Sequence, residues 1–160
     1  MKNFISISIL FLSLLCVNNV LFAQISIKDT ITIPKELKSI THHKVIIGGK
    51  TIQYTATAGA LILRNTQDEP IAFFGYTAYT KDEESELDKR PITFAYNGGP
   101  GSSSMWLHMG ALGPKRVVVN DPFNNKPAPY KVEDNQFSIL EKSDVVFIDP
   151  IGTGISKAVG

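Results

Sequence analysis

The sequence predicts an α/β fold in which antiparallel strands at the front lead into a mostly parallel sheet. The first indication is the period-two alternation of apolar and polar residues before residue 80, typical of strands with one buried face. The second is a pair of continuous apolar runs, PITFAY at 91–96 and DVVFID at 144–149, typical of parallel strands buried on both faces. Such a sheet needs more strands and covering helices, so these 160 residues are expected to be the front part of a larger protein.

The antiparallel part is predicted to contain two hairpins. Residues 25–33 alternate isoleucine with polar residues and indicate an additional strand. A glycine pair divides residues 43–59 into two β-rich runs, which is a hairpin signature. The polar turn NTQDEP separates two further apolar runs within residues 60–79 and predicts the second hairpin. The charged run at 81–90 is expected to be a solvated loop.

The later half is predicted to alternate strands with short connections. A short helix is expected after the glycine-rich segment, with Ser102 as its N-cap. PKRVVVN at 114–120 indicates another strand, and the Asn- and Pro-rich residues 120–136 indicate a loop. The strand at 144–149 is followed by PIGTGIS at 150–156, which is typical of a turn.

The first 23 residues are predicted to be a signal peptide. Lys2 supplies the positive start, residues 4–15 form the apolar core, and Ala23 is a small residue before a cut at Gln24. The apolar core is too short to span a bilayer comfortably. A retained anchor, or a lipoprotein acylated at Cys16, is the alternative. We therefore divide the chain into the signal peptide, residues 1–23, and part of a folded domain, residues 24–160.

The composition narrows the class of protein. Hydrophobic residues make up 43% and charged residues 19%, which is globular, and a net charge of +1 gives no reason to expect a nucleic-acid partner. The only cysteine leaves with the signal peptide, so the mature chain has neither a disulfide nor a thiol nucleophile. These features favour a secreted or periplasmic protein of a bacterial cell envelope, with no stable membrane span after cleavage.

The segment NGGPGSSS at 97–104 follows the first buried strand directly. A phosphate loop is a poor explanation, because no Gly-Lys-Ser/Thr completes it. A purely structural turn is a second interpretation. The third is an oxyanion hole, in which glycines let amide N–H groups approach the oxygen of a tetrahedral intermediate after a strand of an α/β-hydrolase.

Three ordered segments resemble the serine carboxypeptidases: NGGPGSSS, GALGP at 110–114, and VVFIDPIGTGIS at 145–156. The resemblance covers residues 94–156 and implies the N-terminal part of an α/β-hydrolase fold. It implies a Ser-Asp-His triad that releases C-terminal amino acids from peptides with a free terminal carboxylate, with neither metal nor cofactor. No Gly-x-Ser-x-Gly elbow occurs, so the resemblance places the triad beyond residue 160, and the chain alone is expected to be inactive.

The resemblance also assigns roles within the segment. Gly99 corresponds to the glycine whose backbone N–H stabilises the oxyanion. Asn97 corresponds to the asparagine whose side chain binds the substrate's terminal carboxylate, with Gly98 helping through its own N–H. Three positions depart from the family pattern: Ser102 stands where eukaryotic members have a disulfide cysteine, Ala95 where they have a tryptophan, and Ala111 where they have a glutamate of the carboxylate-binding network.

Other residues able to do chemistry are expected to be structural. Ser156 lies in GISKA, which only partly resembles a nucleophile elbow, and is expected to be a turn hydroxyl. His42 and His43 are adjacent, so on a strand they face opposite sides and do not share a metal. His108 is expected to pack or to face solvent, and Asp149 to be structural. Residues expected in the core or a pocket wall are Met105, Trp106 and Leu107.

Two other functions stay open at this point. One is a non-catalytic secreted fragment of a truncated gene. The other is an esterase or acyltransferase on the same scaffold, because a fold does not fix a reaction. An in-frame Gly-x-Ser-x-Gly beyond the codon for Gly160, with later Asp and His, would support the peptidase over the fragment.

The signal peptide gives the first testable prediction. Mass spectrometry of the cell-envelope fraction should find a mature N-terminus at Gln24, because Ala23 is the small residue that precedes the cut. Intact Met1 found only in the cytoplasm would refute export.

Overall fold

The computed structural model describes residues 35–82, 89–119 and 130–159. Contacts divide the chain into two units, 1–32 and 33–160, and all described residues belong to the second. The predicted signal peptide (1–23) and the predicted strand at 25–33 lie outside the described residues.

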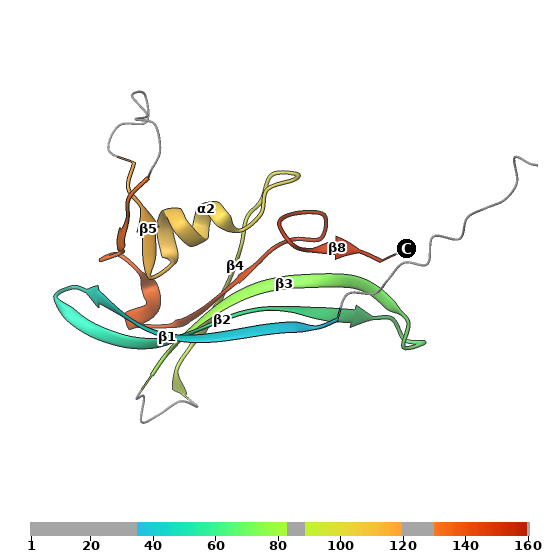
Figure 1. The fold of residues 1–160 in the computed structure, drawn as a ribbon, viewed down its shortest axis with the longest axis horizontal. Coiled ribbons are helices and arrows are strands. Elements are labelled where there is room, and N and C mark those ends of the chain that lie inside the picture. The colour runs from blue at the N-terminus through green and yellow to red at the C-terminus, as the bar shows by residue number, and fades with distance from the viewer. Residues whose placement is uncertain (1–34, 83–88, 120–129, 160) are drawn as a thin grey trace, which may run out of the picture. The chain divides into compact units, whose positions relative to one another are not determined.

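Three antiparallel strands form the first part of the sheet: β1 (Leu37–Ile47), β2 (Lys50–Arg64) and β3 (Pro70–Lys81) (Figure 1). Gly48 and Gly49 have φ of +56° and +80°, the left-handed conformation that a two-residue hairpin loop requires. Both predicted hairpins are confirmed. They share one long strand, because β2 runs without interruption through the boundary expected near residue 60.

Strand β7 (Asp144–Ile148) joins this meander to β4 (Ile92–Tyr96). The order is β1-β2-β3-β7-β4, and β8 (Lys157–Ala158) also pairs with β3. β7 is antiparallel to β3 and parallel to β4. The described sheet is therefore mixed, with β4–β7 as its one parallel pair, rather than mostly parallel as predicted.

The sequence also predicted that β4 is buried on both faces, and within the described residues this is wrong. Only Ala95 of this strand is buried, whereas three apolar side chains on the alternate positions are 57–66% exposed: Ile92, Phe94 and Tyr96. The period of two places them together on one side of the strand. No described element covers these side chains.

The elements after β4 depart most from the prediction. A single α-helical turn, α2 (Met105–Leu107), continues into a π-helical turn, η3 (His108–Leu112). Its N-cap residue is Ser104 rather than Ser102, and the Ser104 side chain makes no capping bond. The interpretation of Ser102 as the N-cap is therefore wrong.

A second small sheet pairs β5 (Lys115–Val117) with β6 (Val132–Asp134). β5 confirms part of the strand predicted at 114–120. β6 lies inside the stretch predicted as a loop at 120–136, so that prediction is wrong for its end. Cross-strand ion pairs hold the two strands, and η4 (Ile139–Glu141), a short 3₁₀ helix, follows with Ser138 as its cap.

Two small apolar clusters form the core. The first consists of Val45, Ile47, Ile52, Tyr54 and Leu140, and the second of Ala95, Val145 and Phe147. Tyr79 packs against both clusters. The core therefore continues from the first hairpin to the strand that joins the meander to β4.

An aromatic group extends this core to His108. The His108 ring stacks on Phe147 with centroids 4.6 Å apart, and its Nε2 is hydrogen-bonded to the Tyr79 hydroxyl at 2.5 Å. Burial raises the pKa of Tyr79 to about 12, with the nearby Tyr54 adding to the effect. Burial also lowers the pKa of His108, partly opposed by the negative charge of Asp149. Of the two outcomes expected for His108, packing or facing solvent, the structure shows packing.

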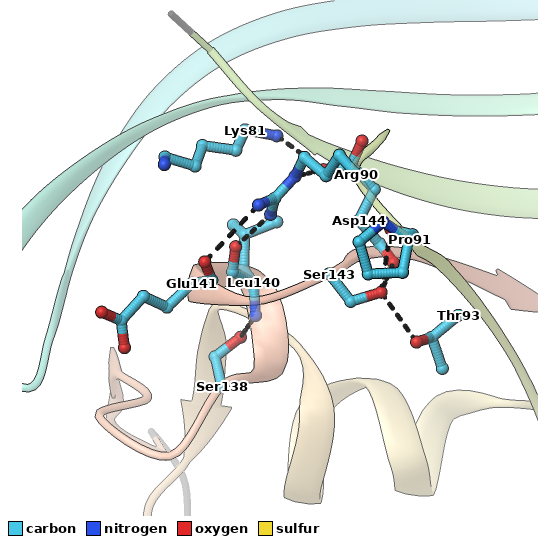
Figure 2. Close-up of polar contacts among 9 residues, drawn as sticks. All are labelled: Lys81, Arg90, Pro91, Thr93, Ser138, Leu140, Glu141, Ser143 and Asp144. Atoms are coloured by element: carbon cyan, nitrogen blue, oxygen red, sulfur yellow. Dashed lines mark hydrogen bonds and ion pairs between the residues drawn. The ribbon is translucent and has the colours of Figure 1, made fainter. Parts of the chain in front are cut away.

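A buried ion pair fixes the start of β7 (Figure 2). Asp144 Oδ1 accepts hydrogen bonds from Arg90 Nε at 2.6 Å and from the backbone N–H of Lys81 at 3.0 Å. The Arg90 guanidinium also donates to the backbone carbonyls of Leu140 and Glu141 in η4. With only 6% of its side chain exposed, Arg90 does not belong to a solvated loop, so the loop predicted at 81–90 is wrong at this end.

Hydroxyl groups continue this network to β4. Ser143 Oγ shares a 2.8 Å hydrogen bond with Thr93 Oγ1 and donates to the Pro91 carbonyl at 3.1 Å. The network therefore connects β3, β4, β7 and η4 at the point where β4 and β7 begin side by side.

Replacing Arg90 tests the importance of this ion pair. Arg90→Ala leaves the Asp144 carboxylate buried without its cation, so the free energy of unfolding should fall by about 3–5 kcal/mol. The matched control is Lys50→Ala, because the Lys50–Glu141 pair has a lysine side chain that is 75% exposed, and it should change stability little. Urea unfolding measures both, and equal losses would contradict the network's role.

His108 gives a pH-dependent prediction. Its folded-state pKa lies below the ordinary 6.5, so the unfolded chain takes up the proton first as pH falls. The contribution of neutral His108 to the free energy of unfolding should therefore be fully present above pH 6.5 and should be lost progressively as the pH falls toward the folded-state pKa. Thermal unfolding across this range should show a smaller pH dependence in His108→Gln than in wild type, and an unchanged pH dependence would contradict this role of His108.

Candidate active-site loop

The glycine segment, residues 97–104, is attached to the end of β7 at both of its ends. It begins where β4 finishes, and there Tyr96 pairs with Ile148, the last residue of β7. It ends at Ser104, whose backbone N–H and Oγ both donate to Asp149 Oδ1, at 2.9 and 3.0 Å. Because β4 and β7 are parallel, both attachments lie at the carboxyl edge of the sheet.

Glycines in the segment are required by its backbone conformation. Gly99 and Gly101 have φ of +74° and +89°, which L side chains rarely adopt, and Ser102 N donates to the Gly99 carbonyl at 3.3 Å to close a turn. A Cβ at Gly98 or Gly99 would meet nothing within 4 Å, so the segment is open on that side.

The three residues predicted to bind substrate are consecutive in this open turn. Among the described residues, the amide N–H groups of Gly98 and Gly99 have no hydrogen-bond partner. Asn97 is half-buried, and its Nδ2 donates to the Gly98 carbonyl at 3.2 Å. The segment therefore offers amide N–H groups and a carboxamide in one place, a set of donors suited to a carboxylate or a developing oxyanion.

Asp149 makes structural contacts, as expected from the sequence. Its Oδ1 holds Ser104, and its Oδ2 accepts from Ile155 N at 3.3 Å. A Cβ at Gly154 would lie 2.0 Å from Oδ2, so only glycine lets the turn pack so closely against the carboxylate. Packing against Asp149 thus explains Gly154 of the Gly-Thr-Gly motif, whereas Gly152 is required by its φ of +86°.

Ser156 is a turn hydroxyl, as expected. It is 2% exposed, and its Oγ donates to the Asp149 carbonyl at 2.7 Å while accepting from Gly75 N at 2.8 Å. The bond from Gly75 N holds the turn on β3, and the bond to the Asp149 carbonyl holds it at the end of β7. A hydroxyl engaged in this way is placed to support the backbone rather than to attack a substrate.

The expectation for the residues after the segment is only partly right. Met105 and Trp106 are 54% and 67% exposed, so they are not core residues in the described structure. Leu107 is half-buried against the Ala95–Val145–Phe147 cluster. A single helical turn presents one face to the sheet, and Leu107 occupies that face.

Sequence reasoning missed the interaction between Tyr79 and His108. Tyr79 lies in a strand run that the period-two pattern found, but its pairing with a histidine on a later turn leaves no trace in the sequence spacing. The bond from Ser104 to Asp149 was missed for the same reason, since the two residues come from separate motifs.

A separate pocket shares no residue with the glycine segment. It is lined by His43, Lys44, Val45, Ile46, Thr51, Lys115 and Asp134. The hydrogen bond from Lys115 and the backbone N–H of Ile46 lower the pKa of Asp134. The carboxylate is thereby occupied in joining β6 to β1.

The described residues contain no group of three or more His, Cys, Asp or Glu side chains placed to hold a metal ion. Within the same ranges, no helix reaches the length and apolarity needed to cross a bilayer.

Comparison with known proteins is consistent with this geometry. The serine carboxypeptidase family profile matches residues 51–159. The pheromone-processing carboxypeptidase KEX1 of Komagataella phaffii is 40% identical over 75 residues, covering 46% of this chain and 11% of the relative. That of Lodderomyces elongisporus is 34% identical over 116 residues, covering 72% of this chain and 15% of the relative.

Among solved structures, the chain is similar to the crystal structure of Kex1Δp, a prohormone-processing carboxypeptidase from Saccharomyces cerevisiae. The identity is 31% and the TM-score 0.49, over 62% of this chain and 20% of that one. The two curated relatives are yeast proteins, so they do not support the bacterial origin expected from the sequence. The chain spans 11–15% of the length of the two curated relatives. With the match to residues 51–159, the chain belongs to the serine carboxypeptidase family.

Proposed function

We propose that this chain is the N-terminal part of a serine carboxypeptidase that removes C-terminal amino acids from peptides with a free terminal carboxylate. The observation that carries the proposal is the open turn at the carboxyl end of β4, where Gly98 and Gly99 present amide N–H groups that have no partner among the described residues. Family membership supports the same chemistry.

In the proposed mechanism, a serine attacks the scissile carbonyl, a histidine acts as base and then as acid, and an aspartate orients the histidine. This triad comes from residues beyond this chain, which by itself is inactive. Gly99 contributes its backbone N–H to the oxyanion hole. The donor acts where negative charge develops, so its effect is larger in the transition state than in the bound substrate.

Asn97 and Gly98 would bind the substrate's terminal carboxylate. The Nδ2 of Asn97 has two N–H groups, and its present bond to the Gly98 carbonyl is long, at 3.2 Å, and lies at an exposed position. A carboxylate can therefore compete for this donor. Hydrogen bonds to a charged acceptor are the stronger kind, so the pair can recognise a carboxylate without a buried cation.

We further propose that the protein is exported after loss of residues 1–23 and works in a bacterial cell envelope. The chain has no cysteine after Cys16, and by the resemblance Ser102 stands where eukaryotic members of the family have a disulfide cysteine. A protein without disulfides can fold in such a compartment without an oxidation step.

The test separates the carboxylate clamp from the oxyanion hole. In the full-length enzyme, Asn97→Ala should lower kcat/KM about tenfold to hundredfold for a peptide with a free C-terminus, because a hydrogen bond to a charge contributes about 1.5–3 kcal/mol. The same peptide with an amidated C-terminus never makes that bond and should lose little. Asn97→Asp keeps the shape but presents a negative charge, so it should impair the free acid more.

Gly99 supplies the contrast. A valine there would need the unfavourable φ of +74° and would obstruct the oxyanion, so both substrates should lose activity together. If Asn97→Ala instead lowers both substrates by one factor, Asn97 is not a carboxylate clamp. Wild-type hydrolysis of esters without hydrolysis of free-acid peptides would favour the esterase alternative.

A further inference from the structure

Two aspartates lie at the two ends of β7, and each binds a different part of the chain. Asp144 begins the strand and is bound to Arg90 in the network of Figure 2. Asp149 follows the strand and is bound to Ser104, the last residue of the glycine segment. We propose that Asp149 is a positioning residue for catalysis. Its carboxylate holds the glycine segment so that the amide N–H groups of Gly98 and Gly99 stay directed toward the substrate. This inference rests on the proposed function.

The segment has few other supports. Between its two attachments, the hydrogen bonds found among the described residues are Ser102 N to the Gly99 carbonyl and Asn97 Nδ2 to the Gly98 carbonyl, and both are internal to the segment. A Cβ at Gly98 or Gly99 meets nothing within 4 Å, so neighbouring atoms do not confine these glycines on that side. Its position relative to the sheet therefore depends on the pairing of Tyr96 and on the bond of Ser104 to Asp149.

Asp149 is itself held firmly enough to serve as an anchor. Its backbone N–H donates to the Gly75 carbonyl at 3.2 Å, and its carbonyl accepts from Ser156 Oγ at 2.7 Å. The carboxylate is oriented by Ile155 N on Oδ2, which the missing Cβ of Gly154 permits. Strand β3 and the turn at 150–156 thus hold Asp149 in place, and its carboxylate in turn holds the glycine segment.

The expected consequence is kinetic. An oxyanion hole depends on donors that are in place before the reaction, and a displacement of about 1 Å can cost about 100-fold in rate. A loosened segment should therefore reduce kcat, while KM changes less, because the amides act mainly on the transition state.

The experiment compares two substitutions at Asp149 in the full-length enzyme. Asp149→Ala removes both acceptors and should lower kcat about 100-fold. Asp149→Asn keeps one oxygen that can accept both bonds from Ser104, so it should recover most of the lost kcat. Ser104→Ala removes only the Oγ bond and keeps the N–H bond, and its kcat should lie between wild type and Asp149→Ala.

The matched control is Asp144→Asn at the other end of the same strand. It weakens the buried pair with Arg90 and should lower the melting temperature, yet leave kcat unchanged well below that temperature. A similar kcat in Asp149→Ala and Asp144→Asn would make Asp149 merely structural and overturn the inference. If Asp149→Ala does not fold, Ser104→Ala decides, and wild-type kcat in that variant also overturns it.

Failure of the proposed function looks different. A wild-type enzyme that releases no C-terminal residue from peptides contradicts the proposed function itself. An active wild type whose kcat is insensitive to Asp149 and Ser104 contradicts only the positioning role.

Discussion

Strand β7 connects the two halves of the described sheet, and the buried contact between Asp144 and Arg90 sets where that strand begins. β7 pairs antiparallel with β3 on one side and parallel with β4 on the other. The guanidinium of Arg90 also bonds the carbonyls of η4, which brings Leu140 into the core beside the first hairpin. Burying two charges is costly unless their hydrogen-bonding groups are satisfied. Here Asp144 Oδ1 accepts a second hydrogen bond, from the backbone N–H of Lys81.

Once β7 is placed, the position of the glycine segment follows from its other end. Tyr96 pairs with Ile148, and Ser104 is bonded to Asp149, so the two ends of the segment are attached to consecutive residues. A segment that leaves the sheet and returns to nearly the same point must fold back on itself. The left-handed conformations of Gly99 and Gly101 make that reversal possible.

Glycine serves two physical purposes around this edge of the sheet. In the segment itself, Gly99 is needed for its backbone angles, while the space where a side chain would lie is open. At Gly75, a Cβ would lie 2.1 Å from Ile155 Cγ1, so glycine is needed there for close packing of the turn on β3. At Gly154 both reasons apply, since φ is +52° and the Asp149 carboxylate occupies the space. Gly98 and Gly99, where a Cβ would meet nothing within 4 Å, are the glycines we propose to face substrate.

Local patterns in the sequence determined much of this chain. Alternation and the glycine pair were enough for both hairpins, because side-chain direction and turn conformation are decided by near neighbours along the chain. The ordered motifs at 97–104, 110–114 and 145–156 were enough for the family. The role of Ser156 as a turn hydroxyl was also foreseen, since its segment only partly resembles a nucleophile elbow.

Contacts between residues distant in sequence decided the features that local patterns did not predict. Arg90 is the last residue of a charged run, yet it is buried because it forms an ion pair with Asp144, which is remote in sequence but lies beside the start of β4. Ser104 rather than Ser102 begins the helical turn, since Asp149 binds it. β6 forms within a Pro- and Asn-rich stretch because its charged side chains meet Lys115 and Arg116 on β5. The sequence by itself determined the strands, the hairpin turns and the family, whereas only the tertiary structure decided which charges are buried and which carboxylate holds the glycine segment, because those partners are brought together by folding alone.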